Sequence, residues 1–255
     1  MTIINVNSDN IDHEHICCAI SEKKGENCAG SKKDWMKERF SDGLVFKKLD
    51  ERGKVFIEYI PSENAFAPIV ASNYMYINCF WVSGKFKGQG YANVLLEECI
   101  KDAKEKGKYG LTILSSKKKI PFLSDPKFLK YKGFKVCDST SPYYELLYLP
   151  FTDDKSNPIP RFNESVHAKD VDKEGIVLYY TNQCPHTEKY ANLIKDIADG
   201  HKVKFKLNKI RTTKEAQLAP APFTTYSMFI NGVFETNEIL SEKKFLKIIT
   251  EKELI

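Results

Sequence analysis

The spacing of hydrophobic and polar residues in the first part of the chain predicts a mixed α/β unit. Apolar residues recur every three or four positions in the predicted helices. The predicted strands are short runs rich in β-branched and aromatic residues. The expected helices are 33–40 and 91–106, and the expected strands are 44–49, 54–60, 74–82, 111–114 and 143–149. Gly107 stands directly after the longer helix, as a C-terminal capping residue does.

A second α/β pattern follows a proline-rich stretch. Residues 150–160 contain three prolines and several turn formers, which excludes a helix or a central strand there. Beyond it, the expected strands are 175–180, 202–207, 226–230 and 233–236, and the expected helices are 185–198, 213–218 and 241–251. Asn231 and Gly232 form the hairpin signal between the last two strands. We therefore expect an α/β (α+β) chain with a first domain over 1–150, a linker over 151–174 and a second domain over 175–255.

Composition removes several classes of protein. The chain has 255 residues, 42% of them hydrophobic, and a net charge of +5 spread along its length, so we expect no nucleic-acid partner. No apolar run approaches the roughly 18 residues of a membrane helix, and the N-terminus shows no secretory signal, which favours a cytoplasmic protein without a membrane partner. Seven cysteines without a C-x-x-C pair indicate reduced thiols. His13 and His15 flank Glu14, but we expect no metal site.

The most informative segment is the glycine-rich stretch between the strand 74–82 and the helix 91–106. Gly84, Gly88 and Gly90 allow a tight turn and a close approach to a ligand. The first N–H groups of the helix have no intrahelical partner, and together with the helix dipole they make an anion site. Lys85 and Lys87 add positive charge, so the segment predicts a pyrophosphate site. It does not match the P-loop pattern, and position 93 lacks the third glycine of a dinucleotide fingerprint.

The same residues carry a family resemblance. Lys87-Gly-Gln-Gly-Tyr-Ala92 resembles the [RQ]-x-x-G-x-[GA] loop of the GNAT N-acetyltransferase superfamily, with lysine in the first position. Phe128-Leu-Lys-Tyr-Lys-Gly-Phe134 resembles the short helix and Gly-Phe of that family. The resemblance covers about residues 1–150 and implies a GNAT-type mixed central sheet with flanking helices. It also implies an acyltransferase that moves an acetyl group from acetyl-CoA to an amine of a small molecule or peptide by direct attack of the amine. A homodimer is compatible with the resemblance.

The resemblance implies particular site residues. Main-chain groups of Phe80, Trp81 and Val82 would pair with the pantetheine arm of acetyl-CoA. The N–H groups that would hold the pyrophosphate belong to Lys87, Gly88, Gln89, Gly90, Tyr91 and Ala92. Proton transfer needs an acid and a base, for which Tyr131 and Tyr91, and Glu58 or Glu63, are the candidates. Leu129 occupies the position where the family often has tyrosine, so a coenzyme-binding regulator without turnover stays an alternative.

Cys184 is the candidate functional residue of the second domain. It follows a predicted strand and directly precedes a predicted helix, a position that should lower the pKa of its thiol. The turn from Cys184 to Thr187 resembles the C-x-x-C/S turn of thioredoxins and glutaredoxins, and GNAT followed by this tail resembles proteins with a YoaP-like C-terminal domain. The resolving cysteine is absent, and so is a cis-proline in register before the hairpin, although Pro220 and Pro222 lie just upstream. The second hypothesis is therefore a monothiol function of Cys184, with the GNAT-like domain only binding CoA. Another possibility is that the second domain serves only for packing.

Overall fold

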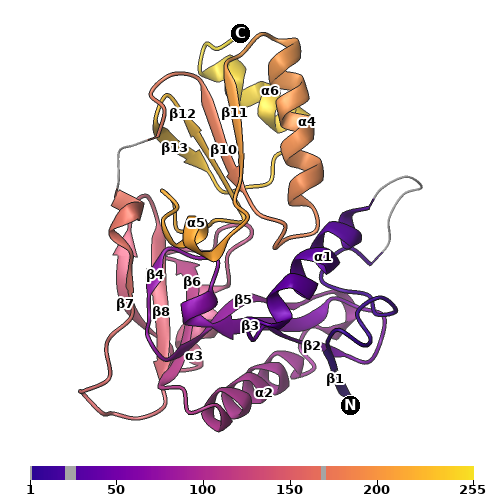
Figure 1. Ribbon diagram of the computed structural model, residues 1–255, viewed down its shortest axis with the longest axis vertical. Helices are drawn as coiled ribbons and strands as arrows, with labels where there is room; N and C mark the ends of the chain where they lie inside the picture. Colours follow the sequence, from indigo (N-terminus) through magenta and orange to yellow (C-terminus); the bar gives the residue numbers. More distant parts are fainter. Residues whose placement is uncertain (1, 21–26, 168–170) are drawn as a thin grey trace.

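The computed structural model describes residues 2–20, 27–167 and 171–255. Two larger sheets, with a two-stranded sheet beside them, form the chain, and the part with the smaller of the two lies above the part with the larger in Figure 1. The larger sheet has seven strands in the order β1-β2-β3-β5-β6-β8-β7. All its neighbouring strands are antiparallel except β5 and β6. The strands are β1 (Ile3–Val6), β2 (Val45–Leu49), β3 (Val55–Pro61), β5 (Tyr74–Val82), β6 (Gly110–Ser116), β7 (Lys135–Thr140) and β8 (Tyr144–Pro150). This mixed central sheet with flanking helices confirms the predicted fold class.

The centre of this sheet opens where β5 and β6 part. Among the described residues, the two strands pair only over Tyr74–Ile77 and 110–113. At the next position the register between β3 and β5 shifts, so that Asn78 is an extra residue on β5. A β-bulge bends its strand and increases the local twist. The last residues of β5, 79–82, therefore have a strand neighbour on one side only.

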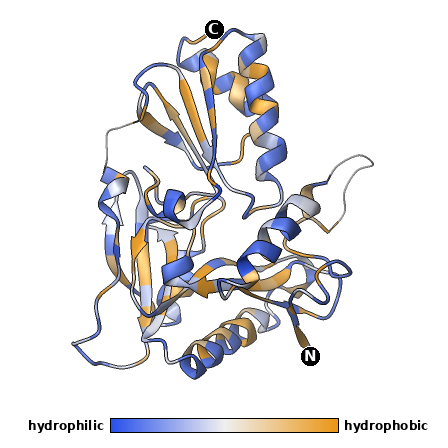
Figure 2. Cartoon of the chain, viewed as in Figure 1, coloured by the Kyte–Doolittle hydropathy of each residue, from blue (hydrophilic) through white to orange (hydrophobic). Residues whose placement is uncertain are grey.

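Helices cover both faces of the large sheet. On one face, α2 (Tyr91–Glu105) and α3 (Pro126–Tyr131) bury an apolar stripe against β3, β5 and β6. On the other face, α1 (Cys28–Phe40) contributes Trp35 and Met36 to a core that continues into the C-terminal part of the chain. The hydropathy colouring in Figure 2 shows hydrophobic strands and a hydrophilic outer side on α2. This amphipathic pattern explains why the periodicity of α2 predicted it correctly.

The smaller sheet has the order β11-β10-β12-β13. β10 is parallel to β11, whereas β12 and β13 are antiparallel to their neighbours. Its strands are β10 (Ile176–Tyr180), β11 (Phe205–Lys209), β12 (Tyr226–Ile230) and β13 (Val233–Thr236), and its helices are α4 (Thr187–Gly200), α5 (Thr213–Gln217) and α6 (Glu242–Glu251). Asn231 and Gly232 have φ angles of 49° and 80°, as a type I′ hairpin turn requires.

Several predicted boundaries were wrong. α4 begins at Thr187, not at residue 185, and α1 begins at Cys28, five residues before the predicted start. The strand expected over 202–207 is Phe205–Lys209, because the N–H groups of residues 201–203 still bond to carbonyls of the last turn of α4. β1 and β7 were not predicted. Within the described ranges, the one cis peptide is Ser141–Pro142.

The segment between β8 and β10 connects the two larger sheets along the chain, and direct contacts also hold them together. In the joining segment, β9 (Arg161–Phe162) pairs with β4 (Ile69–Val70), and a 3₁₀ turn covers Glu164–His167. The apolar core on the α1 face includes Ile210, Ala216 and Ala219 of the C-terminal part. Consequently the two parts share buried apolar surface. Among the described helices, none has the length and apolar composition needed to span a membrane.

Candidate active site

The segment from β5 to α2 has the backbone conformation that its glycines allow. A 3₁₀ turn covers Gly84–Phe86, and Gly90 is the N-terminal capping residue of α2. Gly84, Gly88 and Gly90 have φ angles of 64°, 76° and 82°, in the left-handed region that other residues rarely adopt. A Cβ atom on any of the three would meet nothing within 4 Å. These glycines are therefore required by the backbone angle and not by crowding.

The N–H groups of residues 88–92 point to a binding role for this loop. In the described part of the chain, none of these five groups donates to a protein acceptor, and the first bonds of the helix are donated by Asn93 and Val94 to the Gly90 carbonyl. The Gln89 side chain braces the loop by donating to the carbonyl of Lys85 at 2.6 Å. Free N–H groups at the positive end of a 15-residue helix form an anion site.

A buried aromatic side chain holds this loop in place. Phe86 lies against Gly53, in the turn between β2 and β3, where an added Cβ would come within 2.2 Å of the Phe86 ring. The Phe86 ring also packs edge-on against Tyr91, with 5.6 Å between the ring centroids. The structure thus gives Tyr91 a packing contact within the loop.

A cavity of about 220 Å³ lies beside the loop, between β5 and α3. It is lined by Phe80, Trp81, Val82, Lys87, Ala92, Lys119, Leu123, Ser124, Asp125, Phe128 and Leu129. Of the predicted cofactor residues, the fold brings 80–82, 87 and 92 together around this cavity, whereas 88–91 do not line it. Lys119 was missed as a site residue, although the run of three lysines at 117–119 was its signal. Leu129 is fully buried. An apolar side chain therefore lines the cavity at the position where the family often has tyrosine.

Glu58 lies on the other face of the sheet, fully buried beneath α1. Its Oε2 atom is 2.5 Å from Nζ of Lys32, which is also fully buried, and its Oε1 atom accepts a hydrogen bond of 3.0 Å from Nδ2 of Asn78. The ammonium group of Lys32 also lies 4.1 Å from the centroid of the Trp35 ring. Both carboxylate oxygens of Glu58 are therefore engaged. Lys32 and Asn78 were missed because nothing in their local sequence links them to Glu58.

The remaining acid and base candidates lie away from the cavity. The Tyr131 side chain, at the end of α3, is 83% exposed and is not part of the cavity wall. Glu63 accepts a hydrogen bond from the Asn73 backbone and pairs with Lys108 at 3.4 Å, which makes it a loop-fixing residue. Tyr76 is a tyrosine that sequence reasoning did not select. It is buried on the α1 face, and burial raises the pKa of its phenol.

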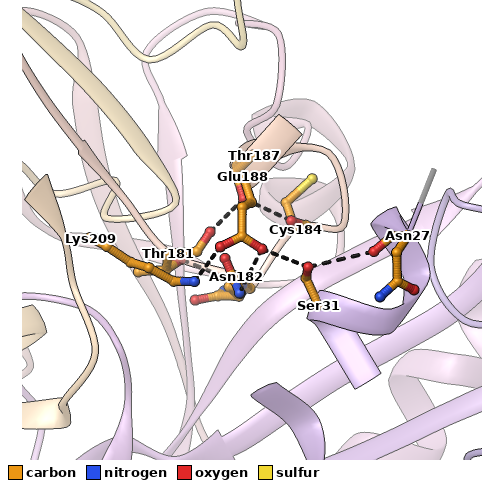
Figure 3. Close-up of polar contacts among 9 residues, drawn as sticks. Asn27, Ser31, Thr181, Asn182, Cys184, Thr187, Glu188 and Lys209 are labelled. Carbon is orange, nitrogen blue, oxygen red and sulfur yellow. Dashed lines mark hydrogen bonds and ion pairs between the residues drawn. The ribbon is translucent and has the colours of Figure 1, made fainter. Parts of the chain in front are cut away.

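The lowered pKa expected for Cys184 is wrong. Burial raises the pKa of this thiol to about 11 and outweighs the hydrogen bond from the backbone of His186. α4 begins three residues later, at Thr187, so Cys184 does not sit at the first turn of the helix. The Thr187 hydroxyl bonds to the carbonyl oxygens of Thr181 and Cys184 (Figure 3). Thr187 therefore closes this turn instead of assisting the thiol.

Comparison with known proteins identifies the class to which this fold and loop belong. Residues 14–123 match the Acetyltransferase (GNAT) family, and residues 204–247 match the family described as YoaP-like. The chain belongs to the GNAT N-acetyltransferases, a family of acyltransferases, and carries a YoaP-like domain. A curated relative is the "Uncharacterized N-acetyltransferase YoaP" of Bacillus subtilis (strain 168). The two are 42% identical over 249 residues, which is 98% of this chain and 98% of the relative.

Solved structures also resemble part of the chain. The GNAT family N-acetyltransferase YhbS from Escherichia coli, in complex with CoA, is 16% identical over 52% of this chain and 76% of that chain, with a TM-score of 0.37. The PaiA N-acetyltransferase from Thermoplasma acidophilum, in complex with coenzyme A, is 16% identical over 59% of this chain and 100% of that chain, with a TM-score of 0.39.

Proposed function

We propose that this protein is an acetyl-CoA-dependent N-acetyltransferase acting on an amine of a small molecule or peptide. The observation that carries the proposal is the set of N–H groups of residues 88–92, which have no acceptor among the described residues, next to the part of β5 that has left β6. The pyrophosphate of acetyl-CoA would bind these N–H groups, and its pantetheine arm would pair with residues 80–82 as an added strand. Lys87 and Lys119 line the same cavity and would add attraction for the phosphates.

The proposed reaction is a direct attack. The amine nitrogen attacks the acetyl carbonyl, the resulting tetrahedral intermediate collapses, and the C–S bond breaks to release coenzyme A. An N–H group at the free edge of β5 would stabilise the oxyanion, an effect of about 3–4 kcal/mol in comparable sites. Glu58 would act by holding Asn78, because Lys32 and Asn78 occupy its carboxylate.

We also propose the domain division 1–150, 151–174 and 175–255, with a thioredoxin-like second domain. The order β11-β10-β12-β13, with β10 parallel to β11 and α4 between them in sequence, supports this description because thioredoxins and glutaredoxins use the same arrangement. A thiol-handling function gains no support, since a thiol whose pKa is raised to about 11 stays protonated at neutral pH.

Binding of acetyl-CoA, measured by calorimetry, tests the proposal through two matched variants. Gly90 and Gly107 lie at opposite ends of α2, both have positive φ, and a Cβ at either meets nothing within 4 Å. Gly90→Leu and Gly107→Leu should therefore each lose about 1–2 kcal/mol of folding free energy. Only Gly90→Leu should also weaken acetyl-CoA binding, by about tenfold or more.

Two results would contradict the proposal. One is equal loss of acetyl-CoA affinity in the Gly90 and Gly107 variants, because the loop would then act only through overall stability. The other is a wild-type protein that does not bind acetyl-CoA at millimolar concentration.

A further inference from the structure

A second, smaller cavity lies between the large sheet and the C-terminal part of the chain, and we name it the junction pocket. It is lined by Phe66, Tyr76, Ile77, Asn78, Leu114, Phe122, Leu123, Ser124, Gln183, Pro222, Phe223, Thr224 and Thr225. Its volume is about 20 Å³, which is room for one water-sized group. Because this volume is so small, only the narrow tip of a ligand would fit in the pocket. One of its lining residues, Phe122, is 46% exposed.

The junction pocket adjoins the cavity assigned above to acetyl-CoA. Leu123 and Ser124 line both. Asn78 is the bulge residue at which β5 leaves β6, and Leu114 is the first residue of β6 beyond the last β5–β6 pair. The pocket thus lies on the α1 side of the opening in the sheet, whereas the cofactor cavity lies on the α2 side. This places it where the second reactant would meet an acetyl group.

The polar lining of the junction pocket favours an N–H donor. The Oδ1 atom of Asn78 is buried and has no hydrogen-bond partner among the described residues. Its orientation is fixed, because Nδ2 of the same side chain donates to Glu58, which in turn is paired with Lys32. A buried acceptor without a hydrogen-bond partner destabilises the folded state, and an incoming N–H group would recover that loss.

The pocket also favours an uncharged ligand. Among the residues that line it, none carries a formal charge at neutral pH. The ionisable groups around Asn78 include the ion pair of Lys32 on α1 and Glu58 on β3, the thiols of Cys17, Cys18, Cys79 and Cys184, and the phenol of Tyr76. Burial raises the pKa of these thiols and of the phenol, so they stay neutral, and the ion pair cancels its own charge. Removal from water lowers the pKa of an amine, so the pocket would hold the neutral, nucleophilic form.

The C-terminal part supplies one wall of this pocket. That wall consists of Gln183, next to Cys184, and the segment 222–225 that precedes β12. It is fixed to the large sheet because the Thr224 hydroxyl donates to the carbonyl of Phe66. The Asn237 side chain adds a bond of 3.2 Å to the carbonyl of Pro121, next to Phe122.

From these contacts we propose that the junction pocket is the acceptor site, completed by the C-terminal domain, and that it takes the tip of an unbranched primary amine. This inference rests on the acetyltransferase function proposed above. In the transfer step the amine nitrogen forms a bond to the acetyl carbon and the C–S bond breaks. The proton that the nitrogen loses ends on the departing thiolate of coenzyme A. The Oδ1 atom of Asn78 accepts a hydrogen bond from the other N–H of the amine. This hydrogen bond directs the lone pair of the amine nitrogen toward the acetyl carbonyl.

The test compares n-propylamine with isopropylamine, which is branched next to nitrogen, as acceptors for the full-length protein. Wild type should acetylate n-propylamine with a kcat/KM about tenfold or more above that for isopropylamine, since a branched tip does not fit. Gln183→Trp should fill the pocket and lower kcat/KM for n-propylamine about tenfold. Gln183→Ala should widen it and reduce the discrimination between the two amines. His201→Trp, exposed at the far end of α4, is the matched control and should behave as wild type.

Calorimetry with acetyl-CoA distinguishes a failure of the acceptor assignment from a failure of the proposed function. Unchanged acetyl-CoA affinity in both Gln183 variants is expected, because Gln183 does not line the cofactor cavity. A protein that binds acetyl-CoA but acetylates neither amine, or whose amine preference ignores both Gln183 variants, would overturn the acceptor assignment alone. A protein that does not bind acetyl-CoA would overturn the proposed function itself.

Discussion

At the scale of single residues, the ion pair between Lys32 and Glu58 is the most demanding feature of the structure. Both side chains are fully buried, and removing two charges from water costs more than their attraction returns unless further hydrogen bonds satisfy them. Asn78 satisfies one oxygen of Glu58, and the Trp35 ring lies beside the ammonium group. Such a pair fixes the geometry of the neighbouring side chains more than it stabilises the folded state. What it fixes is Asn78, the bulge residue at the opening of the sheet.

Replacing one partner of this pair should be costly. Glu58→Gln leaves the Lys32 charge buried without its counter-ion, so the free energy of unfolding should fall by about 3–5 kcal/mol. Asp12→Asn removes the partner of Lys37 from a pair of 2.7 Å whose side chains are 41% and 63% exposed, and should lower the free energy of unfolding far less than Glu58→Gln, because solvent screens an exposed pair. Urea unfolding measures both. Similar small losses in the two variants would show that Lys32 finds another partner or loses its proton.

The residues of the proposed cofactor site could be chosen from sequence alone, whereas those of the proposed acceptor pocket could not. The proposed pyrophosphate loop is continuous in sequence, and its glycines express a local backbone requirement, which the positive φ angles of Gly84, Gly88 and Gly90 confirm. Asn78, Lys32 and Gln183 lie on three segments, and only the folded chain brings them near one another. The error on Cys184 has the same origin, because its burial depends on packing between distant segments.

At the scale of elements, the inner strands of the large sheet were predicted, whereas its two edge strands, β1 and β7, were not. β5 matched its predicted bounds because its residues are aromatic and β-branched. β7 lies at the sheet edge, and its sequence Lys135–Thr140 is mostly polar and exposed to solvent over much of its length. Without an alternating apolar pattern, nothing local distinguishes such a strand from a loop.

The packing of the glycine-rich loop between β5 and α2 on the β2–β3 turn gives a prediction at this scale. Gly53→Ala places a methyl group where it would meet the Phe86 ring at 2.2 Å, so Phe86 must move and the loop with it. We expect a loss of about 1–3 kcal/mol in the free energy of unfolding and weaker acetyl-CoA binding by calorimetry. Gly200→Ala, where an added Cβ meets nothing within 4 Å at the end of α4, should leave both quantities near wild type. Unchanged acetyl-CoA affinity in Gly53→Ala would show that loop position does not depend on Phe86.

At the scale of the whole molecule, a polar cluster holds α4 of the C-terminal part to α1 of the large sheet. Figure 3 shows the carboxylate of Glu188, on α4, between Lys209, Asn182 and Ser31. Ser31 belongs to α1 and donates to Glu188 at 2.6 Å, and Lys209 forms an ion pair with the same carboxylate. If the C-terminal domain completes the acceptor site, this cluster helps to keep that site assembled.

The cluster should make the association of the two parts depend on pH. Burial alone would raise the pKa of Glu188, but the hydrogen bonds from Lys209 and Ser31 outweigh burial and lower it. A carboxylate with a lowered pKa stabilises the folded state above its ordinary value of 4.5, and that stabilisation is lost as the pH falls through the lower folded-state pKa. Glu188→Gln should therefore reduce the melting temperature near neutral pH, and the difference from wild type should shrink as the pH falls below 4.5.

The matched control lies on the same helix. Asp199 pairs with Lys195 at 2.6 Å, and its side chain is 55% exposed, so Asp199→Asn should change the melting temperature little at any pH. Hydrogen exchange then locates the effect: in Glu188→Gln, faster exchange should be concentrated in the amides of α1 and of the first turn of α4, because Ser31 loses its charged acceptor there. A melting-temperature difference that is the same at neutral and acidic pH would contradict this role of the Glu188 charge. Exchange that rises uniformly over both sheets would contradict a contact confined to the junction between them.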